Sequence, residues 1–179
     1  DRLIQITDSI NNHLNINKLN TDLYVWHEGA VDHGTENDFY NTIISALKQW
    51  QAPLLTGMQV VPLDSTKSNF QRVTRATLIQ PNKEGCDYQS YTKNHLAPGS
   101  EKIPYHAFLQ YLPGFPSLDD PRWYRPGDKT ELIQLSNRNG INVNIGTPIC
   151  LEQNYSEIWN SMVKGGAHCF VQLSYESWW

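Results

Sequence analysis

Hydrophobic residues recur along the chain at two spacings, which together predict alternating helices and strands. Spacings of three and four residues, typical of amphipathic helices, occupy residues 2–14 and 37–50, and a third helix is expected over 155–164. Short apolar runs of strand type lie at residues 23–26, 54–61, 74–79, 88–91, 132–135, 141–149 and 169–173. Strands that alternate with helices in this way predict an α/β fold with at least one mixed sheet.

Several connecting positions carry signals of their own. The turn-rich link from Pro81 to Gly85 predicts a hairpin, and Asn139-Gly140 is a strong signal for a second one. Residues 97–130 combine frequent proline and glycine with several aromatic residues, and a loop of that length is usually functional or packed as a lid. Gly57 lies inside an expected strand, where glycine often marks a β-bulge or the close approach of another backbone.

The composition is that of one folded domain. The 179 residues are 18% charged and 39% hydrophobic, and no apolar run approaches the roughly 20 residues needed to cross a bilayer. A net charge of −4 without a dense Lys/Arg tract argues against nucleic acid as the main partner. The opening residues lead directly into a helical pattern, so no signal peptide is expected, and the end at Trp178-Trp179 directly after a strand suggests a fragment.

The three cysteines cannot all pair internally and are too few for a disulfide framework. No Cys-x-x-Cys pair is present to suggest a zinc site, and no metal or cofactor is expected. Cys86, in a turn, and Cys169, in an apolar strand, are expected to act as small buried hydrophobic residues. Cys150 differs because it ends an apolar segment and is followed by Glu152 and a helix-like stretch, an arrangement that resembles a nucleophile elbow.

Two other residues follow expected strands in the same manner. Glu28 lies at a junction where partial desolvation suits a carboxylate to general acid–base work, although an ordinary carboxylate at a helix N-terminus gives the same pattern. Lys93, taken alone, would be interpreted as a surface lysine. His27 and His95 are alternative partners for Cys150 but are less well placed at strand ends. A base, a cation and a thiol from three distant segments form a candidate catalytic constellation.

Glu28, Lys93 and Cys150, in this order and at strand ends, resemble the Glu–Lys–Cys triad of the nitrilase (carbon–nitrogen hydrolase) superfamily. Further landmarks of the resemblance are Pro53-Leu54-Leu55-Thr56-Gly57, Gly165-Gly166-Ala167 and the segment from Leu173 to Trp179. The resemblance covers nearly the whole chain. It implies a nitrilase-like αββα sandwich of two mixed sheets flanked by helices and truncated at both ends, with residues 1–179 as a single catalytic domain.

Within that superfamily, the segment from Leu96 to Pro104 looks like the one that follows the lysine in apolipoprotein N-acyltransferases, with Glu101 as its second glutamate. This resemblance implies an acyltransferase that moves a fatty acyl chain from a phospholipid to the N-terminal amine of a diacylated lipoprotein, through a cysteine thioester. It also implies a location at the bacterial inner membrane, with the domain facing the periplasm. The membrane-spanning part and the last strands of such enzymes are absent from this sequence.

The same resemblance assigns roles to individual residues. Glu28 would be the base, Lys93 the cation that stabilises the oxyanion, and Cys150 the nucleophile. Supporting roles would fall to Glu101, which orients the lysine, to Glu152, which supports the elbow, and to the backbone N–H of Leu151, a second oxyanion donor. Residues 97–130 would form an aromatic lid, and the residues expected to contact the acyl chain are Phe108, Phe115, Trp123 and Trp178.

The chain departs from the family pattern at three places. His27 stands where the family usually has proline, Leu151 replaces the aromatic residue that commonly follows the nucleophile, and Tyr175-Glu176 replace Asn-Asp. Two other interpretations stay open beside the acyltransferase. One is a soluble amidase or nitrilase that hydrolyses a small C–N substrate with water as the acceptor. The other is a catalytically dead nitrilase-like domain that serves as a binding module.

Overall fold

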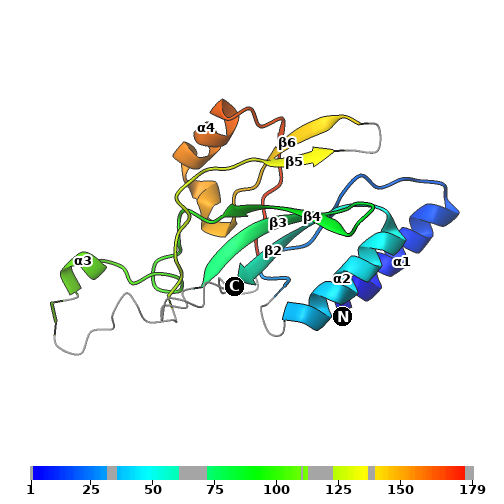
Figure 1. Cartoon of the computed structure of the whole chain (residues 1–179). Coiled ribbons are helices and arrows are strands. Elements are labelled where there is room, and N and C mark those ends of the chain that lie inside the picture. The colour runs from blue at the N-terminus through cyan, green and yellow to red at the C-terminus, as the bar shows by residue number, and fades with distance from the viewer. Residues whose placement is uncertain are drawn as a thin grey trace.

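The computed structural model describes residues 2–31, 36–60, 72–109, 111–112, 123–136 and 140–175. Figure 1 shows two N-terminal helices on one side of a first sheet, and a second sheet with a C-terminal helix on the other side. Both sheets contain parallel and antiparallel neighbours, so both are mixed. This architecture confirms the expected αββα sandwich.

The outer helical layer consists of α1 (Arg2–Ile16) and α2 (Glu36–Trp50), which contact each other and cover one face of the first sheet. Two buried hydrogen bonds join this layer to the chain just before Glu28. The hydroxyl of Tyr24 donates to Asn11 Oδ1 at 2.9 Å, and the indole of Trp26 donates to Thr7 Oγ1 at 3.1 Å. The segment that delivers Glu28 therefore rests on a fixed support.

The first sheet has the order β1 (Tyr24–Val25), β2 (Leu54–Val60), β3 (Val73–Pro81) and β4 (Cys86–Thr92). Strand β1 is parallel to β2, while β2–β3 and β3–β4 are antiparallel, so β1 and β4 run in the same direction. The predicted Pro81–Gly85 turn is confirmed, because Asn82 Oδ1 accepts the N–H groups of Glu84 and Gly85 there. The carboxyl ends of β1 and β4 consequently lie at the same edge of the sheet.

The second sheet has the order β5 (Ile133–Ser136), β6 (Asn142–Gly146) and β7 (Cys169–Phe170). Strands β5 and β6 pair antiparallel, as the Asn139-Gly140 signal predicted, with residues 137–139 outside the described part. A 3₁₀ helix, η1 (Cys150–Asn154), precedes α4 (Ser156–Lys164). Helix α4 ends where predicted, with Gly166 at a φ of +90°. A single helical turn, α3 (His106–Leu109), lies within residues 97–130.

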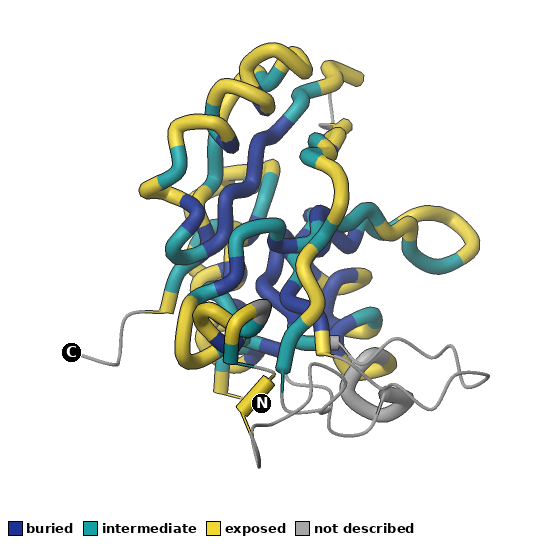
Figure 2. The backbone as a smooth tube through the Cα atoms, turned by 90° about the vertical axis from the view of Figure 1, so that its left-hand side faces the viewer, coloured by how far each residue is buried: buried dark blue, intermediate teal, exposed yellow. Residues whose placement is uncertain are grey.

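Two hydrophobic cores result, one on each face of the first sheet. Along β2, Leu54 and Met58 face the helices while Leu55 faces the second sheet, the alternation expected of a strand buried on both faces. The second core also receives Ile158 and Met162 from α4. Figure 2 shows the buried residues concentrated in the interior of the molecule.

Three details differ from the sequence prediction. The expected strands 141–149 and 169–173 stop at Gly146 and Phe170, because Pro148 has no N–H to donate to the ladder, although the N–H groups of Val171 and Leu173 still donate to the carbonyls of Gly146 and Pro148. Pairing resumes only as an isolated bridge between Ile149 and Leu173. The prediction that Cys169 is buried was wrong: it lies on β7, the edge strand, and is exposed, while Phe170 packs against the second core.

Candidate active site

A cavity of about 890 Å³ brings together Glu28, Lys93 and Cys150, which come from three distant segments of the chain. Glu28 follows β1, Lys93 follows β4, and the two strands end at the same edge of the first sheet. Cys150 arrives from the second sheet. The residues that line the cavity are His27, Glu28, Gly29, Gln59, Lys93, Ala97, Ser100, Glu101, Tyr124, Cys150, Leu151, Gln153, Asn154, Ser174 and Tyr175.

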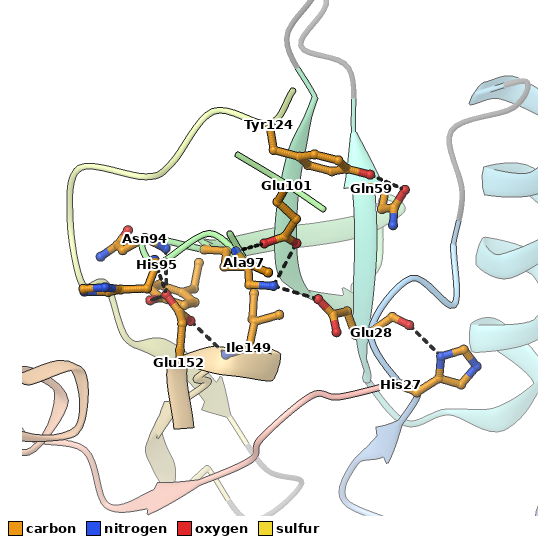
Figure 3. Close-up of polar contacts among 12 residues, drawn as sticks. His27, Glu28, Gln59, Asn94, His95, Ala97, Glu101, Tyr124, Ile149 and Glu152 are labelled. Atoms are coloured by element: carbon orange, nitrogen blue, oxygen red, sulfur yellow. Dashed lines mark hydrogen bonds and ion pairs between the residues drawn. The ribbon is translucent and has the colours of Figure 1, made fainter. Parts of the chain in front are cut away.

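Lys93 is buried between two carboxylates, with only 1% of its side chain exposed. Its Nζ lies 3.1 Å from Glu28 Oε1 and 2.8 Å from Glu101 Oε1. The other oxygen of Glu101 accepts the backbone N–H of Ala97 at 2.7 Å, which fixes the carboxylate that holds the lysine (Figure 3). An ammonium group has three donors, and these two contacts leave the third for a ligand in the cavity.

Glu152 is a fully buried carboxylate that joins the cysteine segment to the lysine segment. Its Oε2 accepts the backbone N–H of Ile149 at 2.8 Å, directly before the cysteine. Its Oε1 accepts three donors, from Tyr91 Oη at 2.8 Å, Asn94 N at 2.7 Å and His95 N at 3.1 Å (Figure 3). Glu152 therefore links the backbone directly before Cys150 to the backbone directly after Lys93, and this contact can provide the support of the elbow that the resemblance implies.

Cys150 occupies a backbone conformation that few residues other than glycine adopt. Its φ is +51°, and strain of this kind concentrates at functional sites. The backbone N–H of Cys150 is used by the carbonyl of Leu173 at 2.8 Å, so it cannot also serve a substrate. The N–H of Leu151, in contrast, hydrogen-bonds to the sulfur and lowers the pKa of the thiol. That N–H therefore points to the place where a reacting atom would lie.

The electrostatics of the site keep the lysine charged and the thiol protonated. Burial alone would lower the pKa of Lys93, but the charges of Glu101 and Glu28 outweigh burial and raise it. Burial raises the pKa of the Cys150 thiol; Lys93 opposes this, while the charge and hydrogen bond of Glu28 raise it further. A thiol in this state needs a base to become a nucleophile, and the carboxylate hydrogen-bonded to it is Glu28.

This environment predicts the pH dependence of alkylation. Because the folded-state pKa of Cys150 is raised, the thiolate fraction stays small at neutral pH and grows only as pH rises beyond the ordinary range of cysteine, about 8.5. We expect the rate of iodoacetamide labelling at Cys150, followed by peptide mass spectrometry, to increase through pH 9 without reaching a plateau. The exposed Cys169 serves as the internal comparison for reagent access. A plateau below about pH 8 would contradict the raised pKa.

Known proteins resemble this chain in sequence and in fold. No protein-family model matches the chain. Apolipoprotein N-acyltransferase 1 of Treponema denticola is 30% identical over 147 residues, which cover 76% of this chain and 26% of that protein. The apolipoprotein N-acyltransferase of Chlorobaculum tepidum is 22% identical over 174 residues, 88% of this chain and 32% of that protein.

Solved structures give the fold. Saccharomyces cerevisiae Nit3, a member of branch 10 of the nitrilase superfamily, superposes with a TM-score of 0.59 at 12% identity, over 96% of this chain and 57% of that one. The chain has the nitrilase-superfamily fold. An amidase from Nesterenkonia sp. gives the same TM-score, identity and coverage. The chain spans about a quarter to a third of the length of the curated relatives that it matches.

Gly57 sets how closely the nitrilase-like sheet approaches Glu28. A Cβ at this position would lie 2.4 Å from the Cα of Glu28 and 2.7 Å from the carbonyl oxygen of His27, so the backbone there would have to move. Gly57→Ala is expected to lower the free energy of unfolding by about 1–3 kcal/mol and to displace Glu28. Urea unfolding measures the effect, with Gly85→Ala as the control, since a Cβ at Gly85 meets nothing within 4 Å. Equal stability of the two variants would disprove the close packing.

The residues expected to contact an acyl chain are less well placed. Phe108 is 75% exposed on α3, which projects away from both sheets (Figure 1), and it does not line the cavity. Trp123 is half-buried and does not line the cavity either. Phe115 and Trp178 lie outside the described residues. Contact between these four aromatic residues and a substrate stays a prediction.

Sequence reasoning assigned no place in the cavity wall to Tyr124, Gln59 or Tyr175, and it named His27 only as an alternative partner for Cys150. Tyr124 closes the cavity beside Glu101 by donating its hydroxyl to Gln59 Oε1 at 2.9 Å and its backbone N–H to the Glu101 carbonyl at 2.9 Å (Figure 3). Tyr175 and His27 also line the cavity and stack on each other, with ring centroids 4.8 Å apart. Tyr124 falls within the aromatic segment 97–130, so composition gave a signal for it. No periodicity distinguishes Gln59, which simply falls on a strand.

Two further features of the described residues concern metal binding and the membrane. Across the described ranges, no group of three or more His, Cys, Asp and Glu side chains has an arrangement that could hold a metal ion. None of the helices that the structure describes is long and apolar enough to cross a bilayer.

Proposed function

We propose that this domain transfers a fatty acyl chain from a phospholipid to the N-terminal amine of a lipoprotein, through a thioester on Cys150. The observation that carries the proposal is the meeting of Glu28, Lys93 and Cys150 in one cavity, in a chain similar to apolipoprotein N-acyltransferases. A location at the bacterial inner membrane, with the domain on the periplasmic side, belongs to the same proposal.

In the first half-reaction, Glu28 takes the proton of the Cys150 thiol while the sulfur bonds to the ester carbonyl carbon. The oxygen of the resulting tetrahedral intermediate carries the negative charge. The third N–H of the Lys93 ammonium and the N–H of Leu151 stabilise it, and one such donor typically contributes about 3 kcal/mol. The bond to the leaving alcohol then breaks, Glu28 returns the proton to that oxygen, and a thioester remains.

In the second half-reaction, a neutral amine attacks the thioester carbonyl and Glu28 removes a proton from the attacking nitrogen. The C–S bond breaks, the proton passes from Glu28 to the sulfur, and an amide and the free thiol result. The same base thus serves both steps, which its position against both the thiol and the lysine permits. Glu101 orients Lys93 throughout, and Glu152 holds the elbow.

The test separates acylation from transfer. The chain is incubated with a phospholipid in detergent micelles, and the mass of the acyl adduct is measured and mapped. A peptide with an N-terminal diacylglyceryl cysteine is then added, and an N-acetylated copy of the same peptide is the control. We expect an adduct on Cys150 that is lost on addition of the free amine and kept with the blocked peptide. Cys150→Ala should show neither adduct nor amide product.

Three outcomes would decide against the proposal. A persistent acyl adduct on Cys150→Ala would remove the cysteine from its role. Release of the acyl group to water at the same rate with either peptide would favour a hydrolase of the amidase or nitrilase type. No adduct with a phospholipid or with an activated fatty-acyl ester would favour a binding module without catalysis.

A further inference from the structure

We propose that His27 and Tyr175 form a positioning pair that holds Glu28 in register with Cys150. The inference rests on the proposed function for its catalytic consequence, but its geometric content stands on contacts within this chain.

The first contact fixes the peptide of the base. His27 Nδ1 lies 2.7 Å from the backbone carbonyl oxygen of Glu28 (Figure 3). A carbonyl oxygen can only accept, so Nδ1 carries a proton and donates it, and this assigns the ring tautomer when the imidazole is neutral. The hydrogen bond orients the imidazole ring and restrains the Glu28 carbonyl at the same time.

The second contact ties this ring to the segment that holds the cysteine. The His27 ring stacks on Tyr175, with centroids 4.8 Å apart and an interplanar angle of 25°. Tyr175 comes two residues after Leu173, whose carbonyl accepts the backbone N–H of Cys150 at 2.8 Å. A continuous set of contacts therefore runs from Glu28 through the two rings to the backbone of the elbow.

Glu28 needs such a restraint because no strand holds it. Strand β1 ends at Val25, and Glu28 lies in a turn that continues through Gly29 at a φ of +66°. The residue before Glu28 is held by Gly57, whose N–H donates to the His27 carbonyl at 3.3 Å. The ring pair of His27 and Tyr175 holds the carbonyl of Glu28 itself. A shift of about 1 Å in a catalytic group can slow a reaction about 100-fold, so the restraint has a functional consequence.

Two substitutions at His27 test the stacked ring and the N–H donor separately. His27→Phe keeps a ring to stack on Tyr175 but removes the N–H, while His27→Asn keeps an N–H near the position of Nδ1 but removes the ring. Tyr175→Ala removes the stack from the other side, and Tyr175→Phe preserves it. His13→Phe, on the exposed surface of α1, is the matched control for replacing histidine by phenylalanine. Thermal unfolding of each variant confirms that it is folded.

The readout is the titration of Cys150, measured without substrate from the pH dependence of iodoacetamide labelling at that peptide. Glu28 helps to raise the pKa of this thiol through its charge and hydrogen bond. Moving Glu28 away from the sulfur should therefore lower the pKa of the thiol. We expect a lower thiol pKa and an acylation rate about tenfold or more below the parent in His27→Phe and Tyr175→Ala. His27→Asn should recover part of both effects. Tyr175→Phe should keep the thiol titration of the parent, and His13→Phe should match the parent in both measurements.

The thiol titration and the acylation rate test the positioning and the proposed function separately. If His27→Phe and Tyr175→Ala leave the thiol titration unchanged while both are folded, the pair does not position Glu28 and the inference is wrong, whatever the acylation rate. If the titration shifts as expected but the parent forms no acyl adduct, the positioning stands and the proposed acyl transfer is wrong.

Discussion

Replacing Glu28 by glutamine is expected to slow acylation of Cys150 by about 10²- to 10⁴-fold while making the thiol easier to alkylate at neutral pH. Burial is the main reason for the raised pKa of the thiol, and the Glu28 carboxylate adds to it. Glutamine removes that negative charge while Lys93 stays beside the sulfur, so the thiol pKa falls and the thiolate fraction grows. Glutamine cannot take the thiol proton, so attack on an ester loses its base.

The two effects have opposite signs, and this result is specific to the base once the variant is shown to be folded. A variant that merely damages the fold would lose acylation and would label like an unfolded thiol, which circular dichroism and thermal unfolding detect. Stopped-flow acylation with an activated fatty-acyl ester and iodoacetamide labelling at pH 7.5 measure the two rates. Parallel losses in a folded Glu28→Gln protein would refute the assignment of Glu28 as the base.

Replacing Glu152 by glutamine is expected to lower the free energy of unfolding by about 2–3 kcal/mol and to suppress acylation strongly. The carboxylate accepts four hydrogen bonds from buried donors, three at Oε1 and one at Oε2. A carboxamide supplies only one acceptor oxygen, so its NH₂ group must face a donor. In the less costly orientation the NH₂ group faces the N–H of Ile149, which displaces the residue directly before the nucleophile.

Urea unfolding measures the loss of stability, and mass spectrometry of the acyl adduct measures the loss of function. Glu157→Gln is the matched control, because Glu157 is 62% exposed and its contact with His95 is 3.9 Å long. We expect the control to change stability by less than about 0.5 kcal/mol. Equal stability in Glu152→Gln and the parent would show that the four-donor arrangement does not hold the elbow.

The fold was accessible from the sequence because burial imposes periodicity. The helix at residues 2–14 and the strand from Leu54 are both confirmed. The helix buries Ile4, Thr7 and Asn11, however, while Ile6 and Ile10 are 47% and 48% exposed, so the spacing predicted the element but not the face that it buries. Element ends were less accessible. Pro148 stops β6 early, and exposure of Cys169 depends on β7 being an edge strand, which is a property of the whole sheet.

The meeting of Glu28 and Lys93 could be anticipated because each follows a strand, and strands that run in one direction end at one edge of a sheet. Cys150 comes from the second sheet, so its place beside them was expected only from the resemblance. The contacts that hold these residues in place could not be anticipated from the sequence. Glu152 has the same chemistry as a surface glutamate until the fold buries it against backbone donors from another segment. The Tyr124–Gln59 hydrogen bond depends on the return path of a long loop, for which no local pattern exists.

The central claim is that Cys150 is the nucleophile and that Glu28 activates it. The most direct measurement maps the acyl adduct after exposure of the parent and Glu28→Gln to an activated fatty-acyl ester, by peptide mass spectrometry with a hydroxylamine step that cleaves thioesters. The account predicts a hydroxylamine-labile adduct confined to Cys150 in the parent and nearly absent in Glu28→Gln at early times. An adduct on Cys86 or Cys169, or one on Cys150 that forms equally fast without the Glu28 carboxylate, would contradict it.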